Sequence, residues 1–147
     1  MPLYFAYGSN MNQAQMHERC PGAKLLGVAK LKDYMLAMTI YSPIRLCGCA
    51  DVIQSSGDSV CGLLYKLTNE EQKSMDSFEG VPIYYRRITI EVHKDGEVLK
   101  AYTYEVINKK DGLKPSKEYL SLIQNAASDF NFPQEYQSYL TSFDVEK

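Results

Sequence analysis

A short polar loop near the N-terminus, Tyr7-Gly8-Ser9-Asn10, carries residues suited to holding a small anion. It follows Leu3–Ala6, an apolar and aromatic run with the composition of a buried strand. Glycine permits backbone conformations that other residues avoid, and Ser and Asn favour turns. Successive backbone N–H groups in such a turn can bind a carboxylate or an oxyanion. The pattern alone also fits an ordinary strand-to-turn junction, which is the simpler interpretation.

The residue sets of common nucleophilic and cofactor-dependent enzymes are missing from the sequence. It has no Gly-x-Ser-x-Gly motif and neither common glycine pattern for phosphate binding. His17 and His93 are the only histidines, and neither lies near a suggestive Ser or Cys. Ser9 is a minor alternative as a nucleophile, because no sequence neighbour would activate it. An enzyme with this sequence is expected to use no protein nucleophile, no metal and no cofactor.

The cysteines are expected to be reduced and packed rather than bridged. A single residue separates Cys47 from Cys49, whereas a zinc knuckle has two, and only the two histidines could complete a metal site. In a strand this spacing places both thiols on one face, which suits core packing. The same expectation holds for the two remaining cysteines, Cys20 and Cys61.

Length and composition indicate a single domain over residues 1–147 with a sizeable core. The hydrophobic content of 45% and the charged content of 23% are ordinary for a globular protein. A net charge of −2 argues against a nucleic-acid surface, which usually needs a basic face. No apolar run could span a bilayer and no signal peptide precedes the first strand, so we expect a cytoplasmic protein without membrane partners.

Before residue 68 the chain is expected to form short strands joined by turns. A helix over residues 11–20 should follow the polar loop, with His17–Arg19 in solvent. The cluster of Gln, Ser, Gly and Asp at residues 54–58 predicts a hairpin turn between the last two strands of this part. Apolar runs predict these strands over residues 23–31, 34–40, 47–53 and 60–67.

The rest of the chain predicts a capped helix, a hairpin and two further helices. Thr68 and Glu71 fit a capping box, so a helix should run from there to about Phe78 and end at Gly80. Strands over 84–93 and 97–107 should join at Asp95-Gly96, and helices should begin after Ser116 and Pro133. Hairpins rather than strand–helix–strand crossovers indicate an α+β fold around a mixed or antiparallel, curled sheet.

Three motifs occur in order along most of the chain. Tyr-Phe-Ala-Tyr-Gly-Ser-Asn stands at residues 4–10, Glu79-Gly80 precedes Tyr84-Tyr85, and Pro-Ser-Lys-Glu-Tyr stands at residues 115–119. Together they resemble the γ-glutamyl cyclotransferase and γ-glutamylamine cyclotransferase-like family. The resemblance implies a small mixed or antiparallel β-barrel with helices packed on the outside, which agrees with the α+β expectation.

The resemblance also implies a reaction that needs no cofactor. A γ-glutamyl amino acid or γ-glutamylamine would become 5-oxoproline plus free amine, because the α-amine of the substrate attacks its own side-chain carbonyl. The role of general base and then general acid falls on Glu79, next to Phe78 and Val81. Such apolar neighbours would raise the pKa of a glutamate toward neutrality.

The expected binding residues follow from the same motifs. The first motif would supply backbone N–H groups and a hydroxyl to the substrate's carboxylate or to the oxyanion. Its residues are Tyr7, Gly8, Ser9 and Asn10. Tyrosine hydroxyls would orient the glutamyl unit, and which of Tyr84 and Tyr85 faces the pocket stays open. The residues chosen for this wall are Tyr85, Tyr104 and Tyr119.

Other functions remain open from the sequence. The chain could be a non-catalytic relative that binds a small carboxylate, or an interaction domain that shares only the fold. The expected partner is a small-molecule γ-glutamyl substrate, with a monomer or a homodimer both open. The leaving group could be an amino acid, the ε-amine of a lysine isopeptide or a biosynthetic amine.

Overall fold

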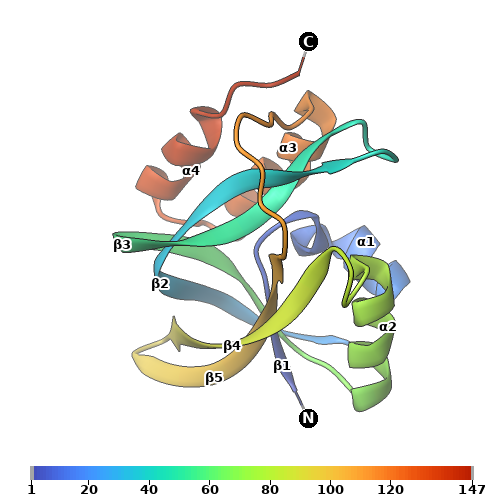
Figure 1. The fold of residues 1–147 in the computed structure, drawn as a ribbon. Helices are drawn as coiled ribbons and strands as arrows, with labels where there is room; N and C mark the ends of the chain where they lie inside the picture. The colour runs from blue at the N-terminus through green and yellow to red at the C-terminus, as the bar shows by residue number, and fades with distance from the viewer. Residues whose placement is uncertain (1, 147) are drawn as a thin grey trace.

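The structure, a computed structural model, describes residues 2–146 and contains a closed five-stranded barrel with helices outside it (Figure 1). This confirms the expected α+β fold with a mixed β-barrel. In chain order the elements are β1 (Leu3–Ala6), the 3-10 turn η1 (Ser9–Met11), α1 (Gln13–Arg19), β2 (Lys24–Ser42), β3 (Cys47–Lys66), α2 (Asn69–Glu79), β4 (Tyr85–Lys94), β5 (Glu97–Val106), α3 (Lys117–Asp129) and α4 (Gln134–Thr141).

The barrel closes in the order β1-β3-β2-β4-β5, with β1 pairing in parallel with β5. All other pairings are antiparallel. The short β1 therefore lies between two long strands at the centre of the fold, and Phe5 and Ala6 in it are fully buried. The loop that follows β1 is held in place at its start, because its first residue comes directly after a buried strand of the core.

The predicted turn at residues 54–58 is wrong, because β3 continues through it as one strand. β2 is also continuous, and it pairs with β3 on both sides of an irregularity: Lys32 faces Ser59, and Tyr34 faces Gln54. Asp33 adopts a positive φ of 65° there, and its Oδ1 accepts a hydrogen bond of 3.0 Å from Gly57 N. The turn-forming residues thus make a wide bulge in a long hairpin.

Local signals fix α2 at both ends, as the sequence predicted. Thr68 and Glu71 form a reciprocal capping box at its start. Gly80 ends the helix in the left-handed region, with a φ of 69°, and Val81 N donates to Asp76 O over 3.0 Å. Met75 is the buried anchor of the helix. Glu79 is therefore held at a helix terminus whose direction is set by the glycine.

Helices α3 and α4 pack on the outer half of the β2–β3 hairpin, whereas α1 and α2 lie beside the barrel (Figure 1). The predicted cap at Ser116 begins α3, and the hydroxyl of Tyr139 in α4 donates to Leu36 O of β2 over 2.7 Å. The side chains that fill the core are fully buried, among them Phe5, Leu36, Leu64, Ile123 and Leu140.

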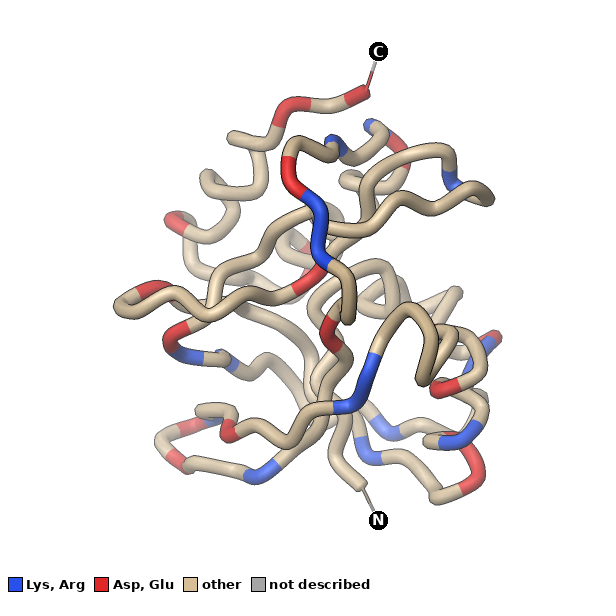
Figure 2. Tube along the Cα trace, viewed as in Figure 1, with Lys and Arg blue, Asp and Glu red and all other residues tan. Residues whose placement is uncertain are grey.

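Charges of both signs are interspersed along the chain (Figure 2). Between residues 2 and 146, no helix is long and apolar enough to cross a membrane. The described residues also contain no cluster of three His, Cys, Asp or Glu side chains with metal-binding geometry. All four cysteines are buried and free, as expected.

Candidate active site

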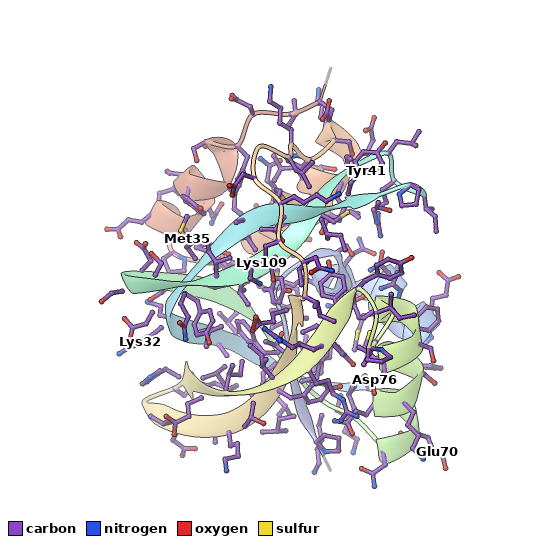
Figure 3. The ribbon with its side chains drawn as sticks, in the orientation of Figure 1. Lys32, Met35, Tyr41, Glu70, Asp76 and Lys109 are labelled. Carbon is purple, nitrogen blue, oxygen red and sulfur yellow. The ribbon has the colours of Figure 1, made fainter. Side chains whose placement is uncertain are left out.

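A cavity of about 760 Å³ opens beside the loop that follows β1. This volume lies within the range of roughly 300–1,000 Å³ that is usual for small-molecule sites. Its walls come from that loop, α1, the tip of the β2–β3 hairpin near Tyr41, the end of α2, and the first turn of α3. Figure 3 shows Tyr41 at the hairpin tip, on the side of the molecule that carries α2.

Asn10 connects the loop to Glu79, and both residues line this cavity. Its Nδ2 donates to Glu79 Oε1 over 3.1 Å and to the hydroxyl of Tyr4 over 2.9 Å. Its Oδ1 accepts from Arg19 Nη1 and from Gln15 Nε2, each over 2.9 Å. Only 4% of Asn10 is exposed, so these bonds hold the amide, and with it the spacing between the loop and the carboxylate.

The Glu79 carboxylate is partly withdrawn from water. Burial raises its pKa above the ordinary glutamate value, while Arg19, the hydrogen bond from Asn10 and Arg45 act in the opposite direction. The net effect is a raised pKa, which moves the group toward the range where it can both take and give a proton. This is the direction that the sequence suggested from Phe78 and Val81, although Phe78 itself is 55% exposed.

The loop backbone lies beside Ala50 and Tyr119. A Cβ added at Gly8 would stand 3.4 Å from Ala50 Cβ and 3.5 Å from the Tyr119 hydroxyl, which are ordinary van der Waals distances, so space alone does not require glycine there. Ser9 and Asn10 begin η1, and the N–H groups at the start of such a turn have no acceptor within it. Both residues line the cavity, so their N–H groups are suited to an anionic oxygen.

Two tyrosines of the predicted wall bond to the same residue of β3. Ala50 N donates to the hydroxyl of Tyr119 over 2.9 Å, and the hydroxyl of Tyr85 donates to Ala50 O over 3.1 Å. Tyr119 therefore keeps its own proton for a further acceptor, whereas Tyr85 has used its proton. Tyr84 is 60% exposed at the cavity mouth, so it is Tyr85 that lies deeper.

The hydroxyls of Tyr7 and Tyr104 are committed to protein partners. Tyr7 donates to the backbone carbonyl of Tyr104 over 2.7 Å, and Tyr104 donates to Asp76 Oδ1 over 2.6 Å. Asp76, labelled on α2 in Figure 3, also pairs with Arg87 over 3.1 Å. Both tyrosines line the cavity, but with their protons committed these hydroxyls can only accept a hydrogen bond from a substrate.

Sequence reasoning missed two arginines that line the cavity. Arg19 was expected in solvent, yet it bonds Asn10 and lies 5.0 Å over the ring of Phe78. Arg45 lies 5.1 Å over the ring of Tyr119, and its Nη2 donates to Gln15 Oε1 over 2.8 Å. The contacts of Arg19 with Phe78 and of Arg45 with Gln15 and Tyr119 join segments far apart in the sequence, so no local pattern signals them.

The alternative nucleophiles are poorly placed for activation. The Ser9 hydroxyl accepts from Gln15 Nε2 over 2.9 Å and lies 3.5 Å from Arg45 Nη2, and both partners are donors rather than bases. Cys49 also lines the cavity, but burial raises the pKa of its thiol to about 12, so it is protonated at neutral pH. The arrangement can shuttle a proton beside a bound anion.

Comparison with known proteins gives consistent matches. The AIG2-like family matches residues 59–140 of this chain. Proteins named Gamma-glutamylcyclotransferase from Bos taurus and Mus musculus are 32% and 33% identical to it over 148 residues, which span 97% of this chain and 78% of each relative. A solved structure named Gamma-glutamyl cyclotransferase is 31% identical and superposes with a TM-score of 0.93, covering 99% of this chain and 89% of the other.

Proposed function

Because this chain belongs to the gamma-glutamylcyclotransferase family and is an enzyme of that class, we propose that it converts a γ-glutamyl compound into 5-oxoproline and a free amine. The observation that carries the proposal is the hydrogen bond of 3.1 Å from Asn10 Nδ2 in the polar loop to Glu79 Oε1, in a cavity of substrate size. A proton-transfer group then lies beside N–H groups that suit an anion.

The reaction begins with loss of a proton from the substrate's α-ammonium to Glu79. The free amine attacks the γ-carbonyl carbon of the same molecule, and a five-membered ring closes. The carbonyl electrons move onto oxygen, which gives a tetrahedral oxyanion. When this intermediate collapses, Glu79 returns the proton to the departing nitrogen as the C–N bond breaks. The ring nitrogen still carries one proton too many, and it passes this second proton through the same carboxylate to the released amine, which leaves as an ammonium ion beside neutral 5-oxoproline. Fixing the reactive conformer supplies much of the acceleration, because both reacting groups belong to one molecule.

Donors around the cavity match the charges of this reaction. The N–H groups of Ser9 and Asn10 are suited to the oxyanion or to the substrate's α-carboxylate. Tyr119 has a hydroxyl proton to donate, since its oxygen accepts from Ala50. The raised pKa of Glu79 supports its double role, because a group of low pKa would return its proton poorly.

Substitution of Glu79 by glutamine tests the mechanism. Glu79→Gln keeps the shape of the side chain but cannot carry the proton, so kcat should fall by roughly 10²–10⁴-fold. Release of 5-oxoproline from a panel of γ-glutamyl compounds is the measurement. Glu70→Gln is the matched control, because Glu70 is an exposed residue of the same helix, and it should keep full activity.

Two results would contradict the proposal. Full activity in Glu79→Gln would remove that residue from the mechanism. Binding of γ-glutamyl compounds by the wild-type chain without release of 5-oxoproline would favour the alternative that the sequence left open, a non-catalytic relative that binds small carboxylates.

A further inference from the structure

The tip of the β2–β3 hairpin brings one arginine, Arg45, to the wall of the cavity. Its Nη2 donates to Gln15 Oε1 of α1 over 2.8 Å and lies 3.5 Å from Ser9 Oγ in the loop after β1. Its Cζ stands 5.1 Å from the ring centre of Tyr119, in the first turn of α3. Contacts from three elements therefore hold the guanidinium beside the polar loop.

Arg45 is held by neutral groups alone. Within residues 2–146, no carboxylate forms an ion pair with it. The amide of Gln15, the hydroxyl of Ser9 and the ring of Tyr119 carry no charge. A guanidinium has several N–H donors, and these partners use only part of them. Its charge and its remaining donors are therefore available to an anionic ligand in the cavity.

A chain of hydrogen bonds joins Arg45 to the residue of the proposed proton transfer. Gln15 accepts from Arg45, and its Nε2 donates to Ser9 Oγ and to Asn10 Oδ1, each over 2.9 Å. Asn10 in turn donates to Glu79 Oε1 over 3.1 Å. Burial raises the pKa of Glu79, and the charge of Arg45 is among the effects that oppose this rise. Arg45 therefore belongs to the end of the cavity where the glutamyl unit must lie.

The glutamyl unit brings a second carboxylate to this end of the cavity. Its α-amine and its α-carboxylate are attached to the same carbon, so an α-amine at Glu79 places two anions close together, and they repel each other. A cation beside the substrate carboxylate offsets this repulsion. Arg19 is bonded to Asn10 and opposes the raised pKa of Glu79 more strongly than Arg45 does. Arg45 is therefore the cation that remains for the substrate.

Resting on the proposed function, we infer that Arg45 binds the α-carboxylate of the glutamyl unit. A planar guanidinium in a fixed orientation matches the two oxygens of a carboxylate, whereas the N–H groups of Ser9 and Asn10 suit a single oxygen. The loop N–H groups are then left to the oxyanion that forms at the γ-carbonyl. The hairpin tip becomes part of the glutamyl subsite, and Arg45 selects substrates that have a free α-carboxylate.

Two substrates that differ only at the α-carboxylate test this assignment. One is the γ-glutamyl compound of the panel that the wild-type chain turns over fastest. The other is the same compound with the glutamyl α-carboxylate replaced by a carboxamide, and release of the common amine is measured with the full chain. We expect kcat/KM for the acid to exceed that for the carboxamide by roughly tenfold or more. The difference should lie mainly in KM, because the carboxylate is present before and during the reaction.

Variants of the two arginines assign the preference to its residue. The carboxamide also makes the α-amine less basic, but this change is the same for every variant. Arg45→Gln should lower the acid-to-carboxamide ratio by roughly tenfold, and Arg45→Lys, which keeps the charge without the planar fork, should retain part of it. Arg19→Gln should keep the wild-type ratio. Arg86→Gln removes an exposed arginine that pairs with Glu105 outside the cavity, and it should not change the ratio either.

Equal kcat/KM for the two substrates in the wild-type chain, or an unchanged ratio in Arg45→Gln, would overturn the inference and leave the proposed function intact. A ratio lost in Arg19→Gln but kept in Arg45→Gln would assign the carboxylate to Arg19 instead.

If no γ-glutamyl compound releases 5-oxoproline, the proposed function fails, and binding decides the inference separately. Titration calorimetry then compares 5-oxoproline, which keeps the carboxylate, with 5-oxoprolinamide, which lacks it. Tighter binding of the acid that is lost in Arg45→Gln would support the role of Arg45 in a chain that only binds. The same affinity for both compounds, or no binding of either, would overturn it.

Discussion

Asp51 and Glu79 are both carboxylates inside the fold, but their surroundings differ. Asp51 is fully buried, and it accepts from Val106 N over 2.9 Å, from Thr39 Oγ1 over 2.8 Å and from Lys109 Nζ over 2.8 Å. Glu79 receives one hydrogen bond, from the neutral amide of Asn10, and faces a cavity. Asp51 is charge-compensated and structural, whereas Glu79 keeps the capacity to exchange a proton.

The largest expected effect separates the two carboxylates by stability. Asp51→Asn should lower the free energy of unfolding by about 3 kcal/mol, because it leaves the Lys109 ammonium without its buried partner. Glu79→Gln, measured in the same urea titration, should cause no loss. Comparable losses in both variants would show that Glu79 is structural too, and the contrast between the two sites would disappear.

Removing the charge of Lys109 along with that of Asp51 sharpens the first result. In Asp51→Asn with Lys109→Met, no ammonium is left facing a neutral asparagine, and the asparagine can still accept from Val106 N. We expect the double variant to recover about 1–2 kcal/mol of the stability lost in Asp51→Asn alone. A double-mutant cycle in urea measures this. A purely additive cycle would mean that the ion pair, 2.8 Å long, contributes no coupling.

A smaller effect concerns the pH dependence of turnover. Arg19 holds the pKa of Glu79 down, so Arg19→Gln should raise that pKa further. Because the proposed mechanism needs an ionised Glu79 to accept the first proton, the acid limb of kcat/KM should move to higher pH. Arg86→Gln, at an exposed arginine paired with Glu105, should leave the limb in place. A uniform loss at every pH would instead indicate that Arg19 binds substrate.

The smallest expected effect is a pH-dependent gain in stability. The raised pKa of Glu79 means that the folded state holds this proton more tightly than the unfolded state does. Stability from this group is therefore full below the unfolded pKa and is lost as pH rises through the folded pKa. Glu79→Gln removes that loss. It should match the wild-type chain in acid and be slightly more stable at neutral pH, as thermal unfolding can measure.

Local signals allowed α2 and its end to be predicted. The capping box at Thr68 and the positive φ of Gly80 depend on neighbours within a few residues, and both were read correctly. The prediction of a hairpin turn at residues 54–58 is wrong. The Ser, Gly and Asp residues there favour turns, but the pairing of β3 with β2 around Asp33 keeps the segment in one strand. That pairing is a tertiary interaction, which no local pattern encodes.

The candidate site shows the same division. Asn10 and Glu79 could be proposed because each stands in a recognisable motif. The role of Arg45 could not be predicted, because it depends on the approach of the hairpin tip to Gln15 and Tyr119. The hydrogen-bond partners of the tyrosine hydroxyls could not be predicted either. Tyr104 is an expected substrate contact, yet its hydroxyl donates to Asp76 of α2.

The irregularity at Asp33 divides the longest hairpin into two parts. The inner part closes the barrel, and the outer part rests on α3 and α4 and carries residues 43–46 at its tip. Arg45 in this tip bonds Gln15 and lies over Tyr119, and its charge lowers the pKa of Glu79. Replacements in the tip therefore act on the carboxylate of the proposed proton transfer, so this hairpin couples substrate choice to the chemical step.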